Sequence, residues 1–198
     1  MTEFSDAGFS GRMVAMNSPA DSASDDPQLE LNKAIDATAK AFMVAHVSDD
    51  DGHLAQALVL NAGRIAWRLR EKGLEQDTKT SISDVVTNAD HAAERFIATV
   101  LEGIRADDGI VGEEGARTNS TSGRNWVIDP VDGTYNFASG SDYWCSALAL
   151  VRGAAENPDE IITAAVHRPA MGYTWFSGAG LHTTRDGDEL AAINNRSL

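Results

Sequence analysis

The sequence predicts an α+β domain in which helices are layered on a mostly antiparallel sheet. Two observations indicate this fold class. Helical hydrophobic periodicity occupies the first half of the chain, and short apolar or β-branched runs between turn-forming residues occupy the second half. Helices followed by strands favour a layered α+β unit over strict alternation of strand and helix. The 198 residues, of which 42% are hydrophobic, suffice for a buried core.

Helices are expected in the first half of the chain, over residues 29–47, 54–69 and 88–104. Asp50 or Asp51 is expected to cap the second helix, because a short carboxylate accepts hydrogen bonds from the free amides of the first turn. Gly73 is expected to end that helix. The segment before the first helix, residues 1–27, is acidic and serine-rich without periodicity, and we expect it to be flexible.

Strands are expected in the second half, over residues 110–111, 126–128, 145–151, 161–166 and 173–176. Each is a short run of apolar or β-branched residues, and each is bounded by residues that favour turns. These strands complete the α+β assignment.

Composition excludes some classes of function. The chain has 30 acidic and 16 basic residues and a net charge of −14, which argues against a basic nucleic-acid surface. No apolar stretch approaches the length of a membrane span, and the N-terminus lacks the pattern of a secretory signal. The single cysteine, Cys145, suits a reducing compartment. We therefore expect a cytoplasmic protein that binds neither nucleic acid nor membranes.

The most informative segment follows an apolar run and reads Asp129-Pro130-Val131-Asp132-Gly133-Thr134. Pro130 is expected to end the strand, because its nitrogen cannot donate to a ladder. Two carboxylates on one tight turn repel each other and favour a hard cation, Mg²⁺ or Ca²⁺, with the carbonyl of Val131 as a further oxygen ligand. Gly133 and Thr134 could begin a helix whose N-terminus attracts a phosphate. Taken alone, such a pair of aspartates is often only a turn.

Two further acidic segments stand where local structure changes. One is Gly112-Glu113-Glu114-Gly115, after a short apolar run, and the other contains Asp84, Thr87 and Asp90. Each also has a purely structural interpretation. The first could be an exposed acidic turn, and in the second Thr87 and Asp90 could form a capping box at the start of a helix.

Taken in order, these three segments resemble the inositol monophosphatase family, which belongs to a superfamily of metal-dependent, lithium-sensitive phosphatases. The hexapeptide, continued by Tyr135-Asn136-Phe137, is the specific part of the match. The resemblance implies a sugar-phosphatase-like N-terminal domain that binds metal, over residues 54–198. An extra helix and linker are expected over 28–53.

The resemblance also implies a role for each matching residue. The implied metal ligands, for two or three Mg²⁺ ions, are Glu113, Asp129, the carbonyl of Val131 and Asp132. The implied catalytic residues are Thr134, Asp90 and Glu113, of which Thr134 and Asp90 would orient and activate the attacking water. The implied substrate contacts are Gly133, Thr134 and Asp132. Glu114 would lie just behind the ligands, and Lys79 would be a basic loop residue near the site.

The expected function is Mg²⁺-dependent hydrolysis of a small phosphorylated polyol, foremost inositol 1-phosphate, by metal-activated water in a homodimer. Alternative substrates are 3′-phosphoadenosine phosphate, fructose 1,6-bisphosphate and histidinol phosphate. A non-catalytic metal-binding or interaction module is the alternative from a different class. The resemblance further implies a second α/β domain with a Trp-Asp metal ligand, but no tryptophan of this chain precedes an aspartate. We therefore expect that this chain lacks the second domain and is weakly active or inactive alone.

Overall fold

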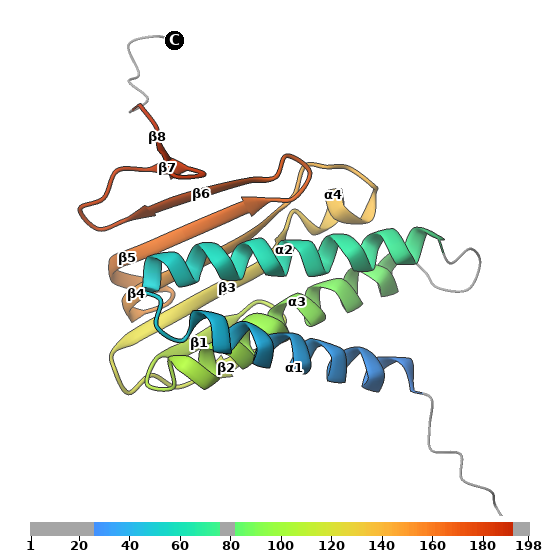
Figure 1. Cartoon of the computed structure of the whole chain (residues 1–198), viewed down its shortest axis with the longest axis horizontal. Helices are drawn as coiled ribbons and strands as arrows, with labels where there is room; N and C mark the ends of the chain where they lie inside the picture. Colours follow the sequence, from blue (N-terminus) through green and yellow to red (C-terminus); the bar gives the residue numbers. More distant parts are fainter. Residues whose placement is uncertain (1–25, 76–81, 192–198) are drawn as a thin grey trace, which may run out of the picture.

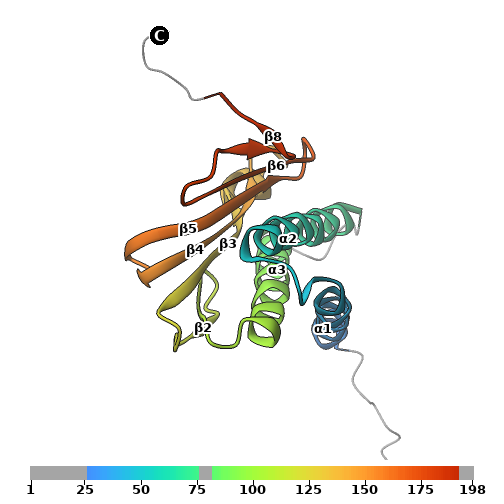
Figure 2. The ribbon, with the colours of Figure 1, turned by 60° about the vertical axis from the view of Figure 1, so that its left-hand side comes forward.

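The helices of the first half of the chain form two layers beside a sheet (Figure 1). The computed structural model describes residues 26–75 and 82–191. Its long helices are α1 (Pro27–His46), α2 (Asp51–Glu75) and α3 (Ile82–Ile104). Figure 2 shows α2 and α3 against one face of the sheet, with α1 outside them. Most of the segment expected to be flexible, 1–27, and the expected site residue Lys79 lie outside the described residues.

The predicted helices are confirmed, but two of their ends differ from the prediction. Asp50 caps α2 as expected, since its Oδ1 accepts a hydrogen bond from the amide of His53 at 2.8 Å. Gly73 does not end α2, which continues to Glu75. A glycine inside a helix costs only about 1 kcal/mol, and packing of the helix can outweigh that cost.

The third helix begins at Ile82, six residues earlier than predicted. Apolar residues at 82, 85, 86 and 89 continue its helical spacing upstream, and the polar residues among them obscured this pattern. Thr87 therefore lies inside α3, and the capping-box interpretation of Thr87 and Asp90 is wrong. The side chains of Asp84 and Thr87 lie outside what the structure describes.

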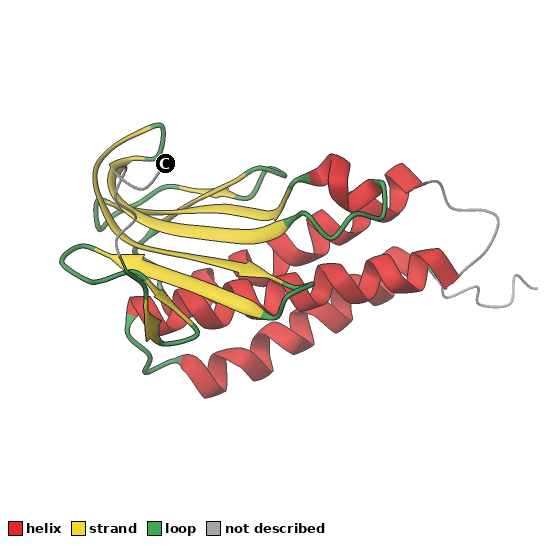
Figure 3. Ribbon diagram, turned by 90° about the horizontal axis from the view of Figure 1, so that it is seen from above, coloured by secondary structure: helices red, strands yellow, loops and turns green. Residues whose placement is uncertain are grey.

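The second half of the described chain forms an eight-stranded sheet in the order β2-β1-β3-β4-β5-β6-β7-β8. The strands are β1 (Gly109–Gly112), β2 (Arg117–Thr118), β3 (Arg124–Asp132), β4 (Cys145–Ala154), β5 (Asn157–Arg168), β6 (Tyr173–Gly178), β7 (Thr184–Arg185) and β8 (Asp188–Glu189). β1 pairs with β3 in parallel, and the other neighbouring strands pair antiparallel. The α+β class with a mostly antiparallel sheet is thereby confirmed. The axes of the strands and of the long helices are roughly aligned with one another (Figure 3).

Alternation along the strands separates a helix-covered face from an open face of the sheet. Trp126 and Ile128 of β3 pair with Leu150 and Leu148 of β4, and all four are buried against the helices. The residues between them, such as Val127, point to the other face because side chains alternate along a strand.

Of the described helices, none is long and apolar enough to cross a membrane.

A buried ionic network fastens the start of α2 to the start of β3. The Asp108 carboxylate accepts hydrogen bonds from the Arg124 guanidinium at 2.9 and 2.6 Å, from the Ser122 hydroxyl at 2.7 Å and from the Trp126 indole at 3.0 Å. Arg124 also bonds Asp51 at 2.7 Å. Burial alone would raise the pKa of Asp108, but these hydrogen bonds outweigh burial and lower the pKa below its usual value.

Candidate functional site

The hexapeptide 129–134 was predicted to end the preceding strand, but residues 129–132 continue that strand. β3 runs through Pro130 to Asp132, so the prediction that Pro130 ends the strand is wrong. Its register against β4 shifts between Asp129 and Asp132. A proline is tolerated in a strand where the ladder is already interrupted, since its missing N–H is not required there.

The register shift determines where the two aspartates point. Asp129 pairs with Ala147 and Asp132 pairs with Cys145, so two residues of β3 stand opposite one residue of β4, which is a β-bulge. In a regular strand, residues three apart point to opposite faces. The extra residue cancels that alternation, because Ala147 and Cys145 are two apart. Asp129 and Asp132 therefore share the open face of the sheet.

The parallel pairing of β1 and β3 brings a third carboxylate to the same place. Gly112 at the end of β1 is in register with Ile128, and the amide of Glu113 donates to the Ile128 carbonyl at 3.3 Å. Glu113 thus lies beside Asp129 at the carboxyl ends of two neighbouring strands. The pKa of Asp129 is raised to about 7, chiefly by burial and then by the negative charges of Glu113 and Asp132.

Asp90 approaches this group from α3. Its side chain is buried, at 4% exposure, one residue before the exposed His91. The pKa of Asp90 is raised to about 8, chiefly by burial and then by the charges of Glu114, Asp129, Glu113 and Glu94, in that order. The acidic site is therefore built from α3, the loop after β1 and the end of β3. Together these segments concentrate negative charge.

The site has one oxygen without a partner. Asp129 Oδ1 is buried and accepts no hydrogen bond from any described residue. A buried carboxylate oxygen without a donor is costly, and a cation removes that cost. As they stand, no three acidic, histidine or cysteine side chains of the described residues are grouped closely enough to enclose a metal ion. The donor set, which consists of hard oxygens, still fits a divalent cation such as Mg²⁺.

The expected metal ligands differ in their exposure and in their hydrogen-bond partners. Asp132 is exposed, and the thiol of Cys145 lies 3.5 Å from its Oδ2. The Val131 carbonyl accepts a hydrogen bond from the Thr134 hydroxyl at 3.3 Å, so these two expected site residues contact each other. Glu113 is exposed at the open face.

A short helix, α4 (Thr134–Ala138), begins directly after the acidic pair. Gly133 is its N-cap with φ +96°, a left-handed conformation that side chains disfavour. A Cβ at this position would lie 3.0 Å from the Tyr143 carbonyl oxygen and 3.3 Å from Cα of Trp144. Only glycine therefore fits the turn between β3 and α4 without strain.

Gly133→Ala is expected to destabilise the protein by about 1–2 kcal/mol from the positive φ alone, and by more because of the close contacts. Urea unfolding measures the loss. Gly140→Ala is the matched control, because Gly140 has φ +81° and nothing within 4 Å of an added Cβ. Equal losses in the two variants would contradict the steric argument.

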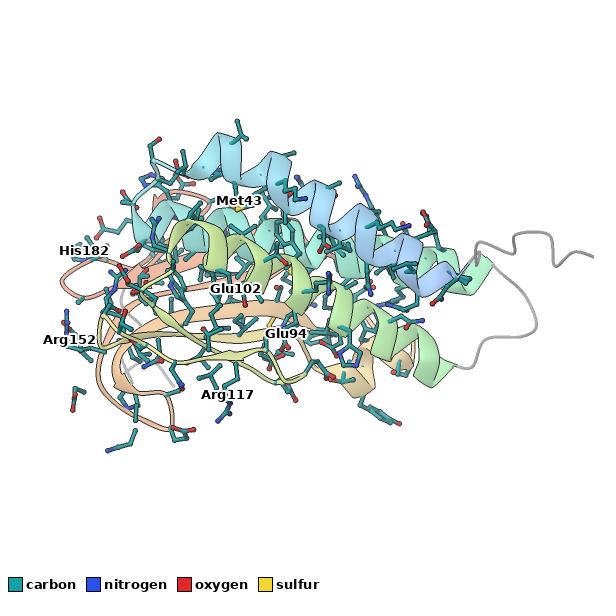
Figure 4. All side chains as sticks on the ribbon, turned by 90° about the horizontal axis from the view of Figure 1, so that it is seen from below. Met43, Glu94, Glu102, Arg117, Arg152 and His182 are labelled. Atoms are coloured by element: carbon teal, nitrogen blue, oxygen red, sulfur yellow. The ribbon has the colours of Figure 1, made fainter. Side chains whose placement is uncertain are left out.

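The sequence reasoning missed Glu94. This carboxylate is buried at 4% exposure on the side of α3 that faces the sheet (Figure 4). It accepts hydrogen bonds from the amides of Glu114 at 2.8 Å and Ala116 at 2.7 Å. The available signal was its position four residues after Asp90, on the same helix face, among apolar residues. Glu114 itself lies 3.5 Å from the imidazole of His91.

Comparison with known proteins shows which family this chain resembles. The model of the inositol monophosphatase family matches residues 51–197. The histidinol-phosphatase of Mycobacterium tuberculosis is 34% identical over 135 residues, which cover 68% of this chain and 50% of that protein. The fructose-1,6-bisphosphatase/inositol-1-monophosphatase of Thermotoga maritima is 32% identical over 122 residues, or 62% of this chain and 45% of that protein.

A solved structure gives the same result for the fold. Inositol monophosphatase II from Staphylococcus aureus MSSA476 superposes with a TM-score of 0.58 at 27% identity, over 71% of this chain and 50% of that one. The chain spans about half the length of the curated relatives it matches.

Proposed function

Because this chain belongs to the inositol monophosphatase family, whose members are metal-dependent phosphatases, we propose that its acidic site serves a Mg²⁺-dependent phosphomonoesterase. The observation that carries the proposal is the bulge in β3. It turns Asp129 and Asp132 to one face, beside Glu113, and leaves Asp129 Oδ1 buried without a donor. A site with surplus negative charge and an unsatisfied hard oxygen suits a divalent cation.

The residues that would hold two or three Mg²⁺ ions are Glu113, Asp129, Asp132 and the Val131 carbonyl. When bound, Mg²⁺ lowers the pKa of a coordinated water and stabilises charge on a phosphoryl oxygen. The Val131 carbonyl accepts a hydrogen bond from the Thr134 hydroxyl, and its second lone pair would be available to the cation. Thr134 and Asp90 would then orient the attacking water. No covalent nucleophile is needed for this reaction.

The turn after β3 would receive the phosphate. Gly133 lets the chain turn without a side chain, and the first amides of α4 point away from the helix. The amides of Gly133 and Thr134, with Asp132 beside them, form the proposed substrate contact. Their position next to the acidic group would place a phosphate ester between the amides and the cation.

The proposed substrate is a small phosphorylated polyol, foremost inositol 1-phosphate. A relative named fructose-1,6-bisphosphatase/inositol-1-monophosphatase supports this class. Histidinol phosphate is the second candidate, because a histidinol-phosphatase is 34% identical over 68% of this chain. The non-catalytic metal-binding alternative predicts Mg²⁺ binding without hydrolysis of any substrate.

Phosphate release from a panel of esters distinguishes these candidates. The panel comprises inositol 1-phosphate, histidinol phosphate, fructose 1,6-bisphosphate and 3′-phosphoadenosine phosphate, each with and without Mg²⁺. We expect Mg²⁺-dependent release, slow in this chain alone, with inositol 1-phosphate the preferred ester. Preference for histidinol phosphate would replace the first substrate by the second, and release without Mg²⁺ would contradict the mechanism.

Mg²⁺ should stabilise the protein more at about pH 8.5 than at about pH 6. The pKa values of Asp129, about 7, and Asp90, about 8, are above their usual 3.8, so the folded metal-free protein binds more protons than the unfolded chain. The contribution of these two groups to the free energy of unfolding therefore falls as pH rises from about 4 to about 8. A cation relieves the repulsion that appears when both groups ionise. Thermal unfolding with and without Mg²⁺ measures the effect, and an equal shift at both pH values would contradict it.

We further propose a homodimer in the cytoplasm that binds neither nucleic acid nor membranes. The net charge of −14 supports the exclusion of nucleic acid. Light scattering of the purified chain tests the dimer. The division of the chain into a flexible segment (1–27), an extra helix with a linker (28–53) and a metal-binding domain (54–198) stays a prediction.

A further inference from the structure

The loop between β1 and β2 carries Glu113 and Glu114, and a side chain of α3 forms hydrogen bonds with its backbone. Within the loop, the amide of Gly112 donates to the Ala116 carbonyl at 2.7 Å. The remaining inward amides, of Glu114 and Ala116, donate to the two carboxylate oxygens of Glu94. One buried carboxylate thus binds both ends of the segment 114–116, which immediately follows Glu113.

The space around Glu94 is closed on the side of the loop. Gly112 is in register with Ile128, and a Cβ at Gly112 would overlap the Glu94 carboxylate. The glycine therefore permits the carboxylate to reach the loop amides. The fit involves Glu94 on α3 and a loop about twenty residues further along the chain, so both must be in place for either to be correct.

A carboxylate in this position has an electrostatic cost. Glu94 lies at 4% exposure, and its charge is one of those that raise the pKa of Asp90. A buried anion next to other anions is unfavourable unless its hydrogen bonds compensate for it. Two charge-assisted hydrogen bonds to backbone amides supply that compensation. Their structural effect is to fix the backbone of 114–116, immediately after Glu113.

We propose that Glu94 is a positioning residue for the metal ligand Glu113, a role that rests on the proposed function. It does not bind the cation. By holding the amides of Glu114 and Ala116, it sets the direction in which Glu113 leaves the end of β1. Partners of this kind, which hold a ligand in place, contribute about 10- to 100-fold to metal affinity.

Three single variants of the full 198-residue chain distinguish a positioning role of Glu94 from an effect of its negative charge on the site. Glu94→Gln removes one charge and leaves one loop amide without an acceptor. Glu114→Gln removes one charge from the same electrostatic group but leaves the Glu94 hydrogen bonds intact. Gly112→Ala keeps every charge and displaces the Glu94 carboxylate by crowding. Mg²⁺ affinity is measured by calorimetry, and exchange of the amides of Glu114 and Ala116 is measured by NMR without metal.

The proposal expects Glu94→Gln and Gly112→Ala to weaken Mg²⁺ binding by about 10- to 100-fold, with faster amide exchange in both. Glu114→Gln is expected to weaken binding less and to leave the exchange of the Ala116 amide slow. Equal weakening in the two Gln variants, with wild-type affinity in Gly112→Ala, would show a charge effect only and overturn the proposal. If Glu94→Gln fails to fold, Gly112→Ala decides between these outcomes.

Failure of the proposed function gives a different result. If the wild-type chain binds no Mg²⁺, both the function and the positioning role are wrong. If the wild-type chain binds Mg²⁺ and the affinity of Glu94→Gln and Gly112→Ala is unchanged, only the positioning role is wrong.

Discussion

Asp129→Asn is expected to abolish Mg²⁺ binding while the chain remains folded. Asn has the shape of Asp but lacks the charge, and the orphaned Oδ1 of Asp129 is the oxygen that most requires a cation. Loss of a direct ligand should weaken binding by more than about 100-fold, because partners that only support ligands already contribute about 10- to 100-fold. Any Mg²⁺-dependent phosphate release should disappear with it.

The same change should not destabilise the metal-free protein. The pKa of Asp129 is raised to about 7 by burial and by the charges of Glu113 and Asp132, which means that its charge is unfavourable in the fold. The amide of Asn carries no charge and can donate to a neighbouring carboxylate. We therefore expect the metal-free variant to unfold at the same temperature as the wild type or higher, without the stabilisation that Mg²⁺ gives to the wild type.

Calorimetric titration with Mg²⁺ and thermal unfolding check both parts. Asp188→Asn, an exposed aspartate on β8, is the control and should leave binding unchanged. Wild-type Mg²⁺ affinity in Asp129→Asn would refute the assignment of this residue as a ligand. A variant that is unfolded before metal is added would refute the stability argument.

Asp108→Ala is expected to produce the largest loss of stability, about 3–5 kcal/mol, because it removes a buried carboxylate that pairs with Arg124 and accepts hydrogen bonds from Ser122 and Trp126. The substitution leaves the Arg124 guanidinium with Asp51 as its remaining carboxylate partner and the Trp126 indole N–H without an acceptor. Arg124 and Trp126 lie at the start of β3, so the damage should spread to the strand that carries the candidate site.

Denaturant unfolding measures this loss, and the neighbouring Asp107→Ala is the control. Asp107 is exposed and accepts one hydrogen bond, from the Thr121 hydroxyl at 3.2 Å, so its removal should change stability by no more than about 1 kcal/mol. Because the pKa of Asp108 is lowered in the fold, its contribution is present above about pH 4 and is lost as pH falls further. The difference between wild type and Asp108→Ala should therefore shrink in acid, and a constant difference would contradict this account.

The sequence was sufficient for the fold class and for the location of the acidic segments. Runs of apolar or β-branched residues between turn-forming residues predicted β3 and β4. The boundary at Gly73 failed because packing of a long helix outweighs a local signal. The boundary at Ile82 failed because polar residues obscured the helical spacing of the apolar residues upstream of residue 88. The two-residue strands β7 and β8 are too short to leave a periodic pattern.

The site was less accessible to sequence reasoning. Proximity of Glu113 to Asp129 followed from acids at the ends of two strands, and the parallel pairing provides it. The role of Glu94 depends on hydrogen bonds to amides about twenty residues away, which no local pattern encodes. The bulge in β3 was equally invisible, because Pro130 suggested an end of the strand rather than an interruption within it.

The bulge also determines which kinds of change the segment can tolerate. Exchanging Pro130 or Val131 for another residue alters side chains but keeps the number of residues between the aspartates. Deleting either one would leave a regular strand in which the aspartates are two apart and still share a face, whereas an insertion that kept the one-residue bulge would turn Asp132 toward the buried helices. Insertion at this point should therefore be far more damaging than substitution or deletion of a single residue.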